Sequence, residues 1–280
     1  MYRTLNPGAI DVSVPFEEGA RLAARYGFAG LAIDPSFLLE HGPDAVLEIL
    51  QQHSLRPGSF GLPVDFRGSD EGFEASLGTL EPLAKAAQAV GCTRASTYIF
   101  SWSDELDFAA NFAFHRERLA PPAAILADHG ISLGLEFLGP KTLRDGHPHE
   151  FVYTVAGMLE LGEAIGPNVG LLLDAWHWYT GTNDAADLDL LTKENVVDVH
   201  VNDAPVGLPR DEQLDNVRCL PGETGVIDIH TFLGRLGRIG YDGPVVVEPF
   251  NAPLRAMVPE DAVRTTAEAL QRVWQGAGLE

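Results

Sequence analysis

The sequence of 280 residues is poor in cysteine and has no long apolar segment. Its two cysteines, Cys92 and Cys219, form no CxxC pair, which argues against a disulfide framework and a thiolate metal site. No apolar run approaches the roughly 20 residues that span a bilayer. The N-terminus also lacks the basic start and apolar stretch of a secretory signal. We therefore expect a cytoplasmic protein with no membrane partner.

Positive charge is scarce as well. The chain has 19 Lys and Arg against 40 Asp and Glu, which gives a formal net charge of −21 at pH 7. Proteins that hold nucleic acid or anionic membranes through broad electrostatics need a basic surface, so neither is an expected partner. Hydrophobic residues make up 45% of the chain and charged residues 21%, which is typical of a globular protein with a large core.

Short apolar runs alternate with longer amphipathic segments along the chain. Apolar runs bounded by Gly and Pro are typical of buried parallel strands, and the segments between them are typical of crossover helices. The expected strands are 3–6, 30–33, 56–61, 94–100, 131–138, 169–174, 196–201 and 244–247. The clearest expected helices are 16–26, 38–53, 70–90, 108–129, 149–166, 227–239 and 259–274.

This alternation fits an α/β protein with a (β/α)₈ TIM barrel, formed as a single domain over residues 1–280. A doubly wound open sheet is the alternative. Its dinucleotide-binding version would carry a GxGxxG turn after the first strand, and the sequence has none there. No Ser/Gly linker, charge block or low-complexity tract divides the chain.

Four consecutive expected strands each carry a carboxylate or an imidazole, and strand ends form the active-site rim of such barrels. These residues are Glu136, Asp174, His200 and Glu248. Taken singly, each has a structural alternative, such as a helix N-cap for Asp174. Taken together, three buried carboxylates repel one another unless a cation lies between them. We predict one divalent metal ion on these four residues, Mn²⁺ first, with Mg²⁺, Co²⁺ or Zn²⁺ as alternatives.

Five segments of the second half resemble the sugar phosphate isomerase/epimerase family, which has xylose isomerase-like TIM barrels. Ketose 3-epimerases, hydroxypyruvate isomerases and inosose dehydratases belong to that family. The segments are GLEFLGPKTLR, NVGLLLDAWHWY, VVDVHVNDAP, LPGETGVIDI and GYDGPVVVEPF. The resemblance implies the same four metal ligands, and it implies that His177 and Arg218 lie against substrate oxygens. Relatives often read GEG where this chain reads GETG at 222–225, which leaves the role of Glu223 open.

The resemblance implies a metal-dependent isomerase or epimerase of a keto-sugar, active in carbohydrate metabolism on a small-molecule sugar. The reaction would remove a proton α to a carbonyl and pass through a metal-bound enediolate. Glu136 and Glu248 would act as the acid–base pair, with His177 assisting. The alternative is a lyase or dehydratase acting on an inosose or a 3-keto-glycoside. A DNA phosphodiesterase on the same barrel conflicts with the charge of −21, and a non-catalytic sugar-binding subunit conflicts with the complete ligand set.

Further residues are weaker candidates. Lys141 could meet an anionic group of the substrate, or it could be a solvated loop charge. Trp176 could stack on a sugar, or it could pack away from His177 if the strand continues through both residues. Asn202 and Asp203 follow His200 and are candidates for orienting the ligands. A homo-oligomer is left open.

Overall fold

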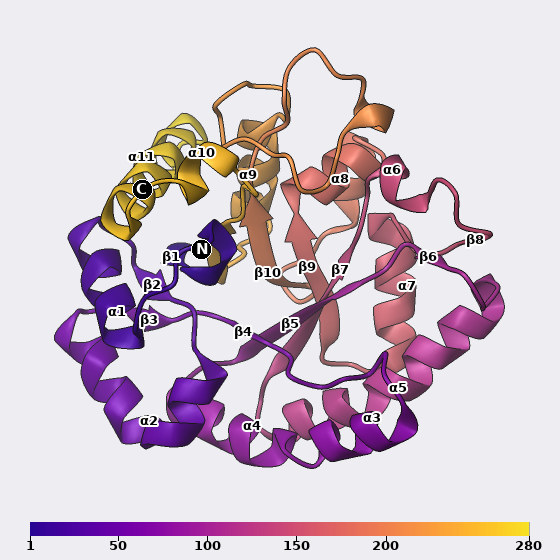
Figure 1. Ribbon diagram of the computed structural model, residues 1–280, viewed down its shortest axis with the longest axis horizontal. Helices are drawn as coiled ribbons and strands as arrows, with labels where there is room; N and C mark the ends of the chain where they lie inside the picture. Colours follow the sequence, from indigo (N-terminus) through magenta and orange to yellow (C-terminus); the bar gives the residue numbers. More distant parts are fainter. Residues whose placement is uncertain (280) are drawn as a thin grey trace.

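Parallel strands curl into a barrel, and helices surround it on the outside (Figure 1). In this computed structural model the main sheet has the strand order β3-β2-β1-β11-β10-β9-β7-β5-β4. The predicted (β/α)₈ TIM barrel is therefore confirmed. The structure describes residues 1–279, so the last residue of the expected 1–280 domain lies outside the described part.

The strands lie close to their predicted positions. A short antiparallel pair at the rim, β6 (Trp102–Ser103) and β8 (His149–Glu150), is an addition that the sequence analysis did not predict. The strands of the main sheet are β1 (Tyr2–Leu5), β2 (Gly30–Leu31), β3 (Arg56–Pro57), β4 (Phe60–Gly61), β5 (Arg94–Ile99), β7 (Ser132–Phe137), β9 (Val169–Asp174), β10 (Val196–Val201) and β11 (Pro244–Val247).

Most helices also match the prediction. Those of the first half are α1 (Phe16–Arg25), α2 (Pro35–Gln52), α3 (Asp70–Leu77), α4 (Leu80–Ala89) and α5 (Phe108–Asp128). Those of the second half are α6 (Lys141–Arg144), α7 (Val155–Ile165), α8 (Ala175–Gly181), α9 (Ile229–Arg238), α10 (Ala252–Arg255) and α11 (Pro259–Gly276).

Two helices differ from the prediction for local reasons. The expected helix 70–90 is divided into α3 and α4, because Pro82 has no N–H to donate to the Gly78 carbonyl. The expected helix 149–166 begins only at Val155, where the Thr154 side chain accepts a hydrogen bond from the Gly157 N–H at 3.1 Å.

The barrel closes through residues 56–61, which form two short strands in place of the single predicted one. β3 pairs with β2, and β4 pairs with β5. Between them, the Gly58 N–H donates to the Leu31 carbonyl at 2.7 Å. A Cβ at Gly58 would lie 2.9 Å from that carbonyl oxygen, so only glycine allows the close approach. The interruption between β3 and β4 leaves Ser59 in the wall of a cavity at the barrel interior.

The four strands that carry the predicted ligands are neighbours in the sheet. β7 pairs with β9, β9 with β10 and β10 with β11, all in parallel. Apolar side chains such as Leu133, Leu171 and Val199 are fully buried below the rim. Burying each such side chain contributes about 1.5–3 kcal/mol, and this packing fixes the strand ends. No helix in residues 1–279 combines the length and apolarity needed to cross a bilayer.

Candidate metal centre

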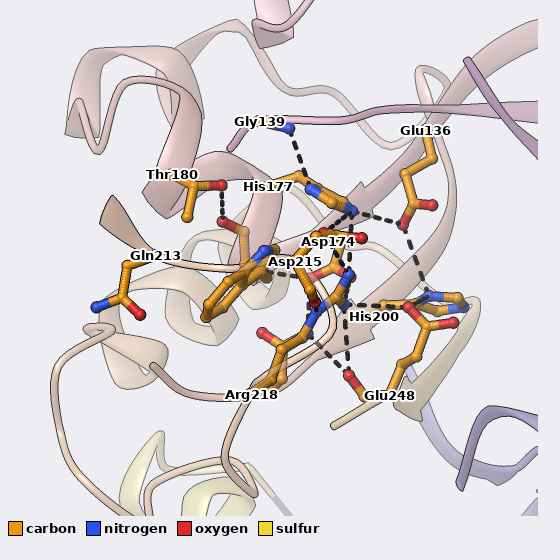
Figure 2. A network of polar contacts seen from close by, with 12 residues as sticks. Glu136, Gly139, Asp174, His177, Thr180, His200, Gln213, Asp215, Arg218 and Glu248 are labelled. Carbon is orange, nitrogen blue, oxygen red and sulfur yellow. Dashed lines mark hydrogen bonds and ion pairs between the residues drawn. The ribbon is translucent and has the colours of Figure 1, made fainter. Parts of the chain in front are cut away.

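The structure brings together all four residues predicted as metal ligands. Glu136 comes from β7, Asp174 from the end of β9, His200 from β10 and Glu248 from just after β11. One donor atom of each lies within 4.8 Å of the others. Figure 2 shows these side chains converging, with His177 and Arg218 beside them. Within residues 1–279 this is the one group of acidic and histidine side chains arranged in this way.

Register and capping explain how the sequence positions Asp174. It pairs with His200 across β9 and β10, so both side chains lie at the same level of the barrel. Asp174 also caps α8, because its Oδ1 accepts the Trp176 N–H at 2.7 Å. The same oxygen accepts the side-chain amide of Asn202 at 2.9 Å, which supports the expected orienting role of Asn202.

Two buried atoms of the cluster lack hydrogen-bond partners. These atoms are Glu136 Oε1 and His200 Nδ1. They are 3.7 Å apart, and His200 Nδ1 lies 3.5 Å from Glu248 Oε2. Buried polar atoms without partners are costly, so this arrangement fits a cation held between them. Carboxylate oxygens and an imidazole nitrogen are donors that divalent ions accept.

The two glutamates of the cluster have opposite pKa shifts. Burial raises the pKa of Glu136 well above its usual value, and the neighbouring Glu248 and Asp174 raise it further. Burial also raises the pKa of Glu248, but His200 and Arg218 outweigh that effect and lower it. The electrostatics therefore favour a proton on Glu136 and a full negative charge on Glu248.

The two histidines differ in the same way. Burial lowers the pKa of His200, but Glu248 and Glu136 outweigh it and raise the value to about 10. Burial and the Arg218 charge lower the pKa of His177 to about 3. Without a metal ion these shifts favour a protonated His200 and a neutral His177, and His200 gives up its proton when it binds a metal.

His177 is oriented by the backbone. Its Nδ1 accepts the Gly139 N–H at 3.1 Å, which assigns the ring proton to Nε2. Nε2 lies 4.0 Å from Glu136 Oε1 and 3.9 Å from Asp215 Oδ1. A Cβ at Gly139 would come within 2.2 Å of the His177 carbonyl oxygen, so glycine is required for this approach.

Arg218 lies in the cluster, as the resemblance implied. Its guanidinium donates to Asp174 Oδ2 at 2.9 Å, to Glu248 Oε2 at 3.1 Å and to Asp215 Oδ1 at 3.0 Å. The sequence analysis missed Asp215. The signal that could have found it is its position three residues before an arginine expected in the site, since a buried arginine needs several acceptors.

Two weaker predictions fall outside this cluster. Trp176 is fully buried, with the Arg218 guanidinium 5.3 Å from its ring centroid. This burial favours the packing alternative, because α8 begins at Ala175 and turns the ring into the core, and stacking on a sugar stays a prediction. The idea of a continuing strand is wrong for the same reason. Lys141 is about half exposed, and its Nζ lies 3.9 Å from Asp211 Oδ2, which favours the solvated loop charge.

The loop after Arg218 is fixed by carboxylates. Asp203 is fully buried and accepts backbone N–H groups from Ala204, Thr224, Gly225 and Ile227. Glu223 is exposed, and its Oε2 accepts the Leu220 N–H at 2.8 Å. Asp203 and Glu223 therefore shape this loop from its two sides.

A cavity of about 610 Å³ opens beside the cluster. His200 forms part of its wall, and most of the other lining residues come from the first half of the chain. Among them are Asn6 after β1, Asp34 after β2 and Ser59 between β3 and β4. The cavity is thus a space in which a small molecule can lie against His200, at the edge of the four converging side chains.

Comparison with known proteins identifies the family. The model of the xylose isomerase-like TIM barrel family matches residues 20–273. The chain belongs to this family. Its xylose isomerase-like relatives include an inosose isomerase of Halalkalibacterium halodurans, 25% identical over 244 residues, or 85% of this chain and 82% of that protein. A ketose 3-epimerase of Arthrobacter globiformis is 30% identical over 151 residues, 53% of this chain and 45% of that protein.

A solved structure supports the same xylose isomerase-like fold. The crystal structure of the IOLI protein with a bound zinc atom has a TM-score of 0.82 and 21% sequence identity, with 99% of both chains covered. The resemblance drawn from the five segments of the second half is confirmed by the family match and by these relatives.

Proposed function

We propose that this chain is a divalent-metal-dependent isomerase or epimerase of a keto-sugar or an inosose. The observation that carries the proposal is the convergence of Glu136, Asp174, His200 and Glu248, with one donor atom of each within 4.8 Å of the others. Glu136 and Glu248 flank one imidazole there, and two carboxylates on either side of a substrate are suited to act as acid and base. The relatives named inosose isomerase and ketose 3-epimerase support the substrate class.

Glu136, Asp174, His200 and Glu248 would hold the metal ion, which fits the unpartnered Glu136 Oε1 and His200 Nδ1. When bound, a divalent ion polarises the substrate carbonyl and lowers the pKa of the adjacent C–H. Mn²⁺ is our first choice, with Mg²⁺, Co²⁺ and Zn²⁺ as alternatives. The zinc atom in the structure of the IOLI protein supports a divalent ion as the cofactor.

The protein side chains supply the proton transfers and the oxygen contacts. Glu248 takes the α-proton, and Glu136 completes the acid–base pair through which a proton returns to the resulting enediolate. Arg218 and the Nε2–H of His177 point into the same cluster and stabilise negative charge on the substrate oxygens. Asp215 holds the Arg218 guanidinium at 3.0 Å, so it acts as a positioning residue.

Three products follow from one enediolate. Return of the proton to the opposite face gives an epimer, return to the neighbouring carbon gives an isomer, and loss of hydroxide gives the lyase product. The metal content of the purified protein is measured first. The protein is then incubated with keto-sugars and inososes in deuterated water, and NMR distinguishes the three products. We expect deuterium at the α-carbon without loss of water. Loss of water would establish the lyase alternative, and no exchange with any compound would refute the proposal.

The role of Glu248 is tested by Glu248→Gln. We expect the rate to fall by about 10²–10⁴-fold while metal is retained, because general acid–base catalysis contributes that much. The matched control is Glu194→Gln, which removes an exposed carboxylate just before β10, at the end of that strand opposite His200. A Glu248→Gln protein with bound metal and wild-type turnover would show that Glu248 is not the base.

A further inference from the structure

The cavity beside the metal centre has an unusual distribution of charge. Its lining includes the carboxylates Asp11, Asp34 and Asp198, and it includes no lysine or arginine from the described residues 1–279. The nearest cations that we identify are already paired. Arg218 contacts Asp174 and Glu248, and Arg255 lies 2.9 Å from Asp11. The wall therefore presents the carboxylates of Asp34 and Asp198 without a lysine or arginine beside them, and His200 is its one residue from the metal centre.

Ser59 and Asp198 give the floor of this cavity a defined hydrogen-bond polarity. Asp198 lies on β10, two residues before His200 on the same inward face, and is only 1% exposed. Its Oδ2 accepts the Ser59 hydroxyl, and its Oδ1 accepts the Val199 N–H at 2.9 Å. Because the Ser59 proton is committed to Asp198, the Ser59 oxygen can only accept a hydrogen bond from a ligand.

The rim of the cavity has the same polarity. Asp34 is exposed and caps α2 by accepting the N–H groups of Ser36 and Phe37 from one oxygen, Oδ1. Its other oxygen remains an acceptor. Acceptors at Ser59 and Asp34, with no lysine or arginine in the lining, favour a ligand rich in O–H donors and disfavour a phosphate or carboxylate, which brings only acceptors and a like charge.

We infer that this cavity binds the neutral, polyhydroxylated part of the substrate, with one substrate hydroxyl donating to Ser59, and that it rejects phosphorylated and carboxylated analogues. The inference rests on the proposed function and narrows its substrate class to unphosphorylated polyhydroxy ketones. Asp198 acts here as a positioning residue, because it fixes the direction of the Ser59 hydroxyl.

The test compares matched pairs of compounds. D-fructose, D-tagatose and D-psicose are each measured against their own 6-phosphates, by deuterium exchange with the dominant metal present. For the pair that reacts best, we expect kcat/KM to be at least about tenfold higher for the neutral sugar, because placing a phosphate against carboxylates of like charge costs that much or more.

The variant Asp198→Asn tests the floor. The new amide donates to Ser59 and turns the hydroxyl proton toward the cavity, so the polarity is reversed. We expect the KM of the neutral sugar to rise about tenfold with little change in kcat. The ratio of kcat/KM for the neutral sugar to kcat/KM for its 6-phosphate should therefore fall. Asp34→Asn, which retains the helix cap, is the second variant should Asp198→Asn not fold, and it should also narrow the preference.

The control is Asp44→Asn, which removes the same charge from an exposed site on α2 outside the cavity. It should leave both KM values unchanged. Equal turnover of a ketose and its phosphate would overturn the inference while leaving the proposed function intact. The inference would also be overturned by an Asp198→Asn protein that keeps its metal, its KM for the neutral sugar and its preference for the neutral sugar over the phosphate. Absence of exchange with every neutral and phosphorylated compound would instead overturn the proposed function, and the inference with it.

Discussion

Arg218 and Asp174 form an ion pair of 2.9 Å in which the two side chains are only 1% and 0% exposed. Both charges have lost their contact with water, so each depends on the other and on the surrounding groups. Arg218 is shared with Glu248 and Asp215, and Asp174 is shared with Asn202 and the Trp176 N–H. This pair therefore links the predicted metal ligands to the predicted substrate contacts.

Arg218→Met should destabilise the metal-free protein. Removing one member of a buried pair costs about 3–5 kcal/mol, because the remaining carboxylates stay buried without compensation. Urea unfolding with and without a divalent ion measures the loss, and metal should restore part of it. Arg264→Ala, which breaks the exposed pair with Asp261, should change little. An Arg218→Met protein as stable as the wild type would show that the buried carboxylates do not depend on Arg218.

Removing the metal should lower the melting temperature. A ligand that binds only the folded state at a hundredfold excess over its Kd stabilises by about 2.7 kcal/mol. Calorimetry of chelator-treated protein, before and after addition of Mn²⁺ or Zn²⁺, measures this change. His200→Ala should abolish it, whereas His230→Ala, at an exposed position, should not. A melting temperature that does not respond to metal in the wild type would count against the site.

Asp203→Ala should loosen the loop that follows Arg218. The buried carboxylate accepts four backbone N–H groups, and hydrogen bonds to charged groups contribute about 1.5–3 kcal/mol each. We expect a loss of at least about 3 kcal/mol in urea unfolding. Glu223→Gln affects a single backbone contact from an exposed position and should cost far less. Equal effects of the two variants would show that Asp203 does not organise the loop.

Stability should fall in mild acid partly through His115. Its ring is buried and stacked 5.0 Å from Phe151, and burial lowers its pKa from 6.5 to about 4. Between these values the unfolded chain binds more protons than the folded protein, so stability decreases as the pH falls from about 6.5 to about 4. The full contribution is about 3 kcal/mol.

His115→Phe removes this titration. As the pH falls from 7 to 4, the wild type should lose more free energy of unfolding than the variant does. Urea unfolding of both proteins at several pH values measures this difference. Parallel pH profiles for the two proteins would show that His115 does not charge on unfolding.

The second half of the fold was predictable from the sequence for a physical reason. Strands buried on both faces read as apolar runs, so a polar residue within one, such as Glu136 or His200, stands out. Asp174 at the end of VGLLLD stands out in the same way.

The missed features depend on contacts between distant parts of the chain. Ser59 and Asp198 are 139 residues apart, and no local sequence pattern predicts that the Ser59 hydroxyl donates to the Asp198 carboxylate. The helix α8 was missed because Asp174 both ends a strand and caps a helix. Asp215 lies in an irregular loop whose path only the Arg218 contacts define.

The sheet order separates two tasks that could be engineered independently. Strands β7, β9, β10 and β11 form one contiguous arc that holds the four ligand residues, whereas most of the cavity wall comes from the loops after β1 and β2 and from residues 59–61. A mutant library confined to residues 6–61 would therefore vary substrate choice while leaving the ligand set unchanged. Replacing residues 6–61 with the same segment of a relative that uses another substrate would make this change in one step.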